Sequence, residues 1–216
     1  MRLPIPLPIR AVLATALALC ALPAAAQAGV VEEAADGTLK YRAASGETNA
    51  LLVTDANRVV EVQDTAGVTS RTPLCVSVSG IKVRCALGIR FSEAQLGDLN
   101  DGASIRTTQR PALVDGGRGN DTFFAGMAPD NSAVEYRGNH DTDVVSYASA
   151  TAGVVMLQDE QFNDGRPSVG DQDNVRRDVE QFIGSPFDDR LEGTRLGLVQ
   201  CVGCVGSSGL SGGTCL

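Results

Sequence analysis

The segment GGRGNDTFF, residues 116–124, combines glycine and an acid in a way that could bind a cation. Glycine is favoured where the backbone must adopt a positive φ or pass close to another group, and Gly116, Gly117 and Gly119 fall within four residues. Asp121 ends the same turn and supplies a carboxylate, whereas Phe123 begins an apolar segment. Two interpretations remain open: a metal-binding turn with Asp121 as a ligand, or an ordinary Gly-Asn-Asp hairpin turn.

The same pattern, an aspartate two residues before an apolar residue and preceded by glycine, recurs along the chain. It is found at Asp143, Asp173 and Asp189, with a weaker case at Asp101. The spacings of 20, 22, 30 and 16 residues between successive acids require insertions that loop out. The apolar partners are predicted core residues: Phe123, Val145, Val175 and Leu191.

This periodicity predicts a chain that winds in flattened coils, with a glycine-rich turn before each short strand. Such turns direct carbonyl oxygens inward, and each aspartate adds a carboxylate. Calcium is bound by six to eight oxygens at about 2.3–2.6 Å, a set that carbonyls and a few carboxylates can supply. Two neighbouring turns are needed to enclose one ion.

On these residues the chain resembles the repeats-in-toxin, or haemolysin-type, calcium-binding family, whose nonapeptide is G-G-x-G-x-D-x-U-x. The resemblance implies that Gly117 and Gly119 offer main-chain oxygens to Ca²⁺ and Asp121 offers its side chain. Asp143, Asp173 and Asp189 would take the role of Asp121 in their own turns, and Asp141 joins the predicted metal ligands. The chain departs from the pattern at 138–145, where Asn139 and Asp141 replace glycines, and at 184–191, where Ser185 and Phe187 do.

The predicted fold class is all-β: an irregular parallel β-roll or β-helix, a solenoid, preceded by a small β-hairpin region. Aromatic residues make up 4% of the chain and no segment shows a helical period, so the core should consist of small aliphatic side chains. The expected organisation is a signal peptide at 1–28, an N-terminal β region at 29–96, calcium-binding repeats at 97–194 and an atypical tail at 195–216. That tail, rich in Gly and Cys, suggests a truncated or frame-shifted end.

Residues 1–28 have the features of an export signal, so we expect a secreted, extracellular protein. Two arginines flank a proline-rich start, an apolar run AVLATALALCAL follows, and AQA ends in small residues. The apolar run is too short to span a bilayer. In an exported chain, Cys75 and Cys85 are predicted to form a disulfide across a β-hairpin with a loop at 79–81.

Composition and motifs argue against nucleic-acid binding and catalysis. The net charge of −8 leaves no basic patch for phosphates. A single histidine, His140, excludes the H-E-x-x-H metalloprotease motif. The G-x-S-x-G match around Ser211 has no histidine after it. Cys201 and Cys204 form a C-x-x-C pair without a fourth zinc ligand. We therefore expect no enzyme activity.

The function predicted from the sequence is calcium-ion binding in an extracellular structural or adhesive module, with a cell-surface or polysaccharide ligand as a further candidate partner. Two alternatives remain. A carbohydrate-binding appendage would need clustered aromatic residues, which the sequence lacks. A non-catalytic fragment of a larger secreted enzyme, such as a polysaccharide lyase, would need basic and acidic residues on one face.

Overall fold

The computed structural model describes residues 28–107, 111–127, 132–192 and 198–200. Within these residues the regular structure is β-strand, apart from one turn of 3₁₀ helix, η1 (Pro167–Val169). The prediction of an all-β chain is confirmed. The described residues contain no helix long and apolar enough to cross a membrane. The predicted export signal, except Ala28, and most of the atypical tail lie outside the described residues.

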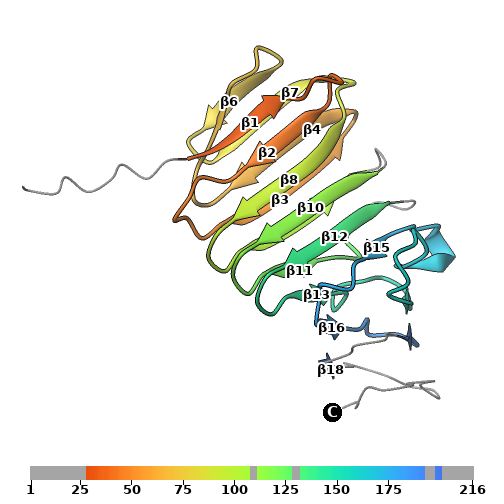
Figure 1. The fold of residues 1–216 in the computed structure, drawn as a ribbon. Coiled ribbons are helices and arrows are strands. Elements are labelled where there is room, and N and C mark those ends of the chain that lie inside the picture. Colours follow the sequence, from red (N-terminus) through yellow and green to blue (C-terminus); the bar gives the residue numbers. More distant parts are fainter. Residues whose placement is uncertain (1–27, 108–110, 128–131, 193–197, 201–216) are drawn as a thin grey trace, which may run out of the picture.

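Two large mixed sheets and one small sheet make up the fold (Figure 1). The first large sheet has seven strands, in the order β15 (Asn174–Val175), β12 (Val134–Asn139), β10 (Ala112–Gly117), β8 (Phe91–Gly97), β2 (Leu39–Arg42), β1 (Gly29–Glu33) and β5 (Val68–Ser70). The second has nine, in the order β18 (Leu198–Gln200), β16 (Gln181–Ile183), β13 (Val144–Ser146), β11 (Thr122–Phe124), β9 (Gly102–Arg106), β3 (Ala50–Ala56), β4 (Val59–Asp64), β7 (Lys82–Leu87) and β6 (Cys75–Ser79). The small sheet pairs β14 (Val155–Met156) with β17 (Arg190–Leu191).

Apart from β14 of the small sheet, the strands from β8 to β16 alternate between the two large sheets, and each pairs in parallel with the strand of the preceding pass. In the first sheet β2, β8, β10, β12 and β15 are parallel neighbours. The second sheet has a matching series of parallel neighbours: β3, β9, β11, β13, β16 and β18. We call each pair of consecutive strands, one from each sheet, a tier: β2/β3, β8/β9, β10/β11, β12/β13 and β15/β16.

The N-terminal end of the stack is built differently, from antiparallel hairpins. Strand β1 pairs antiparallel with β2. In the second sheet β3 pairs antiparallel with β4, β4 with β7, and β7 with β6. Cys75 lies opposite Cys85 in the β6–β7 hairpin, and the two form the predicted disulfide. The hairpin loop consists of Gly80 and Ile81, one residue shorter than expected, because a register shift between Ser77 and Ser79 brings Ser79 opposite Lys82.

Side chains from both large sheets enter one hydrophobic core. Strand β10 shows the period of two that this requires, since Ala112, Val114 and Gly116 are buried and the residues between them are half-exposed. The four predicted core residues Phe123, Val145, Val175 and Leu191 are all buried, between 0% and 6% exposed. Most of the core consists of Val, Leu and Ala, as the low aromatic content predicted.

Candidate functional site

Three five-residue turns connect the first sheet to the second in consecutive tiers, and they share one backbone conformation. We call them the corner turns: residues 97–101, 117–121 and 139–143. Their first and third residues have positive φ in every case. Those positions are Gly97 and Leu99, Gly117 and Gly119, and Asn139 and Asp141. The turns therefore keep their left-handed backbone at the positions where another residue replaces glycine. Among these residues only Leu99 is of a type that disfavours positive φ.

Contact with the preceding tier explains why Gly117 and Gly119 are glycines. A Cβ at Gly119 would overlap the main-chain carbonyl of Leu99, and one at Gly117 would overlap the carbonyl of Gly97. Both residues also have φ near +100° (98° and 114°), a region that L side chains rarely adopt. The glycine spacing that drew attention in the sequence is therefore required by the close stacking of tiers, whether or not a cation is bound.

The fifth residue of each corner turn is a buried aspartate whose carboxylate joins two tiers. Asp101, Asp121 and Asp143 are 4%, 0% and 0% exposed. Asp121 Oδ1 accepts a hydrogen bond from the amide of Asp101 at 2.9 Å, and Asp143 Oδ1 accepts one from the amide of Asp121 at 2.9 Å. Asp101 Oδ1 accepts one from the amide of Asn49 at 2.7 Å, so Asn49 occupies the equivalent place in the first tier. We call these four residues the aspartate column.

The second carboxylate oxygen of each aspartate in this column is buried without a hydrogen-bond partner. The Oδ2 atoms of Asp121 and Asp143 fill the space that side chains at Gly116 and Gly138 would occupy. Burial raises the pKa values of Asp101, Asp121 and Asp143 to about 7 each, and repulsion from neighbouring acids adds to the effect. A proton or a bound cation would remove the energetic cost of burying these negative charges.

A second set of hydrogen bonds runs through the fourth residues of the corner turns, in the opposite sense. Asn100 Oδ1 accepts from the amide of Asn120 at 2.8 Å, and Asn120 Oδ1 accepts from the amide of Thr142 at 2.9 Å. Asp141 is exposed, and its Oδ2 accepts from the amide of Gly119 at 3.0 Å. His140 is exposed in the same turn.

Glu180 extends the aspartate column into the next tier and was missed in the sequence. Its Oε2 accepts a hydrogen bond from the amide of Asp143 at 2.9 Å. Glu180 lies two residues before the buried Phe182, just as Asp143 lies two residues before Val145. A search for either acid two residues before an apolar residue would have found it only without the requirement for a preceding glycine, because residues 175–179 contain none.

Asp173 does not belong to the column, although it obeys the same sequence pattern. It precedes β15 in the first sheet, and both of its carboxylate oxygens have partners. Oδ1 accepts from the amide of Val134 at 3.0 Å, and Oδ2 from the Tyr147 hydroxyl at 2.9 Å. Burial raises the pKa of Asp173 to about 7. The nearby Asp171 is paired with the buried Arg166 at 2.6 Å.

Asp189 lies at the small sheet, apart from the other predicted ligands. Its Oδ1 accepts from the amide of Val154 at 2.9 Å and from the Ser185 hydroxyl at 2.5 Å. Its Oδ2 accepts from the amide of Ser185 at 2.7 Å. This carboxylate therefore holds its own turn closed and ties it to the segment before β14.

The structure thus brings Gly117, Gly119, Asp121, Asp141 and Asp143 together at adjacent corner turns and leaves Asp173 and Asp189 elsewhere. No known protein family, curated protein or solved structure matches this chain. The described residues hold no group of three or more His, Cys, Asp or Glu side chains placed to hold a metal ion. A calcium site at the corner turns would therefore have to be completed by main-chain carbonyl oxygens.

Proposed function

We propose that this chain is an extracellular, non-catalytic calcium-binding module in which the tiers form an irregular parallel β-roll behind an N-terminal hairpin region. The observation that carries the proposal is the buried Oδ2 of Asp121, which has no hydrogen-bond partner in a turn with two left-handed glycines. Asp143, one tier further, repeats the arrangement. A calcium ion would compensate for the burial of these charges.

The donor chemistry of the corner turns fits calcium, which prefers carboxylate and carbonyl oxygens. Asp121 and Asp143 would hold the ion through their carboxylates, and Gly117 and Gly119 through main-chain oxygens. The carbonyl of Gly117 accepts one hydrogen bond, from the amide of His140 at 3.1 Å, and keeps a second lone pair. Asp173 and Asp189 are less suited because both oxygens of each already accept hydrogen bonds.

The parallel pairing from β2 to β15 and from β3 to β18 supports the β-roll interpretation. A disulfide at Cys75–Cys85 is compatible with an exported protein, because such bonds persist in oxidising compartments. Extracellular calcium modules bind with dissociation constants of about 10⁻⁴–10⁻³ M. Several coupled sites, rather than one, would then be needed for a substantial gain in stability.

Isothermal titration calorimetry of the purified chain with Ca²⁺ tests the proposal. Asp121→Asn is the sharpest variant, because an asparagine oxygen still accepts the amide of Asp101 whereas the negative charge is lost. We expect calcium affinity to fall clearly in Asp121→Asn and to stay unchanged in Asp36→Asn, a matched change at an exposed turn. Absence of calcium heat in the wild-type chain, or equal affinity in both variants, would contradict the proposal.

A further inference from the structure

Strand β6 is an edge strand at the N-terminal end of the stack. It pairs with β7 on one side only and is the last strand of the nine-stranded sheet (Figure 1). Its sequence, CVSVS, contains no charged residue and no proline. Natural edge strands usually carry lysine, proline or a strong bulge, which prevent pairing with another chain. Strand β6 has an irregular register between Ser77 and Ser79, but it carries no charge and no proline, so its outer main-chain groups can still pair with another strand.

Apolar side chains are exposed on the same hairpin. Val76 and Val78 of β6 are 64% and 52% exposed. Ile81 in the loop and Leu87 at the end of β7 are 43% and 67% exposed. Val76, Val78 and Ile81 lie on β6 or its loop and form the apolar surface of this edge, whereas Leu87 lies at the end of β7 opposite the loop. Apolar side chains gathered in this way on a soluble domain are typical of an interaction surface.

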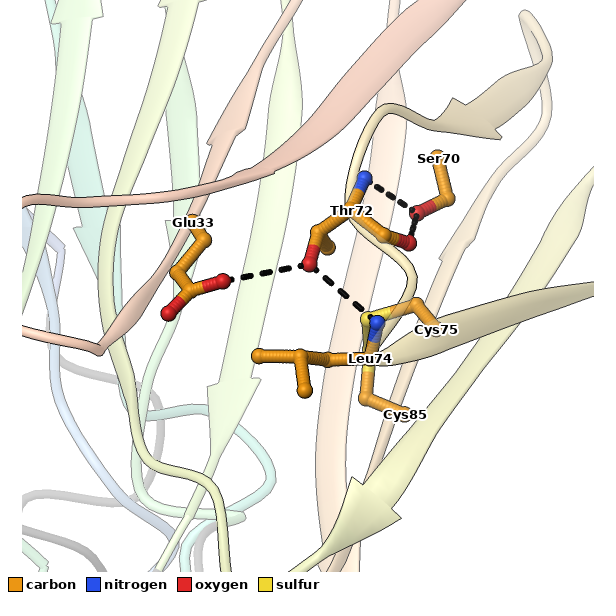
Figure 2. Close-up of a disulfide and its surroundings, with 6 residues drawn as sticks. All are labelled: Glu33, Ser70, Thr72, Leu74, Cys75 and Cys85. Atoms are coloured by element: carbon orange, nitrogen blue, oxygen red, sulfur yellow. Dashed lines mark hydrogen bonds between the residues drawn. A yellow bond between two sulfur atoms is a disulfide. The ribbon is translucent and has the colours of Figure 1, made fainter.

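The hairpin is held firmly enough to present that surface. The disulfide joins β6 to β7, and Thr72 anchors the segment before it: its hydroxyl donates to Glu33 of β1 at 3.4 Å and accepts from the amide of Leu74 at 3.2 Å (Figure 2). At the loop, the carbonyl of Gly80 accepts from the amide of Val68 at 3.0 Å. The edge is therefore a rigid strand rather than a loose loop.

We propose that strand β6 pairs antiparallel with β6 of a second copy of this chain, about a two-fold axis at Ser77, which joins the two nine-stranded sheets. The pattern Val-Ser-Val is self-complementary in this register. Val76 lies opposite Val78 of the other copy, so the four exposed valines meet in two cross-strand pairs. The two-fold arrangement uses the same surface on both copies, and it closes at a dimer.

The distribution of charge favours this pairing over other contacts between copies. Residues 29–90 contain seven acidic and seven basic side chains, whereas residues 91–200 contain nineteen acidic and nine basic ones. In the hairpin, Lys82 and Arg84 are both paired with Glu61, at 3.2 and 2.6 Å. Pairing through β6 places the acidic segments of the two copies at opposite ends of the dimer (Figure 1). Any contact through the later tiers would bring them together.

Sedimentation equilibrium of the purified chain over a range of concentrations tests the proposal. We expect a monomer–dimer equilibrium that stops at two copies and strengthens with added NaCl, because salt screens the repulsion between acidic segments. Val78→Lys should weaken dimerisation about tenfold or more, since the lysine would face an apolar side chain of the partner. The matched control, Leu87→Lys, makes the same change on β7, away from the open edge, and should leave the equilibrium unchanged.

Cross-linking tests the register. Ser77→Cys, in a chain whose cysteines outside the hairpin are replaced by serine, should form a covalent dimer under mild oxidation, whereas the exposed control Ser149→Cys should not. A wild-type chain that stays monomeric at every concentration would overturn the proposal. So would equal effects of Val78→Lys and Leu87→Lys, or growth beyond two copies, which would indicate head-to-tail contacts. The test does not depend on calcium, so it can fail without affecting the proposed function.

Discussion

Asp143 and Asp121 are joined by a hydrogen bond of 2.9 Å between the side-chain Oδ1 of the first and the main-chain amide of the second. Asp121 makes the same bond to the amide of Asp101, so each aspartate is at once a donor to the next tier and an acceptor from the previous one. These bonds satisfy buried amides at the corners, where the sheet ladders end. The aspartates therefore stabilise the stacked tiers by hydrogen bonding, independently of any cation that their other oxygens could bind.

Asp121→Ala should destabilise the chain more than Asp121→Asn when calcium is removed by a chelator. Alanine leaves the buried amide of Asp101 without a partner, a loss of about 1–3 kcal/mol, whereas asparagine can still accept that hydrogen bond. Urea denaturation in the presence of chelator measures the difference. If both variants unfold at the same urea concentration, the column contributes nothing to stability through hydrogen bonds.

Gly119→Ala should lower stability at any calcium concentration. The new Cβ would overlap the carbonyl of Leu99, and alanine resists the φ of +114° at this position. Gly80→Ala is the matched control, since nothing lies within 4 Å of the position that its new methyl group would take and its φ is not in the left-handed region. Thermal unfolding should separate the two variants clearly. Rescue of Gly119→Ala by millimolar calcium would show that ion binding, rather than backbone contact, sets the requirement for glycine.

Much of this fold could be predicted from local sequence rules. Strand alternation and turn residues identified the hairpin of Cys75 and Cys85, because a disulfide across antiparallel strands depends only on short-range geometry. The apolar residue two places after each acid was also predicted correctly as core, since its burial follows from the period of two along a strand. Asn139 and Asp141 keep the left-handed turn, because Asn and Asp tolerate positive φ better than other residues that have a side chain.

The composition of the aspartate column could not be predicted in the same way. Which turns stack depends on how many residues each insertion loops out, and Asp173 and Asp189 obey the sequence pattern while lying at other places in the fold. Glu180, rather than Asp173 or Asp189, occupies the place in the column next to Asp143. The pairing of one carboxylate oxygen with a main-chain amide also leaves no sequence signal, because a metal ligand and a hydrogen-bond acceptor are the same residue type.

The stability of the calcium-free chain should fall as the pH rises from about 4 to about 7. Burial raises the pKa values of Asp101, Asp121 and Asp143 to about 7 in the folded state, against 3.8 for a solvated aspartate. Over that range the folded state holds protons that the unfolded state has lost, so the free energy of unfolding decreases as the pH rises. The stabilisation that these bound protons give the folded state is fully present below about pH 4. Urea denaturation in chelator at several pH values measures the slope.

The carboxylates of the column can be identified as the source of that slope by substitution. Asp121→Asn removes one of the three titrating carboxylates of the column, so its free energy of unfolding should depend less steeply on pH. Asp173 and Asp164, whose pKa values burial raises to about 7 and about 6, keep the remaining slope in this variant. Bound calcium should also flatten the profile, because it favours the ionised carboxylates. A calcium-free stability that rises between pH 4 and 7 would show that other groups dominate.

Cys75→Ser should lower the free energy of unfolding by about 2–3 kcal/mol, the value expected for a loop closed over a sequence separation of 10 residues. The variant frees the Cys85 thiol, which lies in a buried position on β7. Thiol titration under denaturing conditions should find one more reactive group than in the wild-type chain. If the wild-type chain already shows both thiols free, the disulfide does not form and the predicted loss of stability should not appear.

Leu99→Gly should stabilise the chain, against the usual effect of removing a large apolar side chain. Leu99 occupies the third position of its corner turn with φ of +78° and is 47% exposed, so it carries the strain of a left-handed backbone and buries little surface in return. Glycine relieves the strain, worth roughly 1 kcal/mol, although part of the gain is lost to the greater entropy of the unfolded chain. Leu87→Gly is the matched control, because this leucine is 67% exposed but lies in β7, where glycine weakens a strand. Thermal denaturation should therefore move in opposite directions for the two variants. If Leu99→Gly unfolds earlier than the wild-type chain, the side chain makes a contribution at the corner that outweighs its backbone strain.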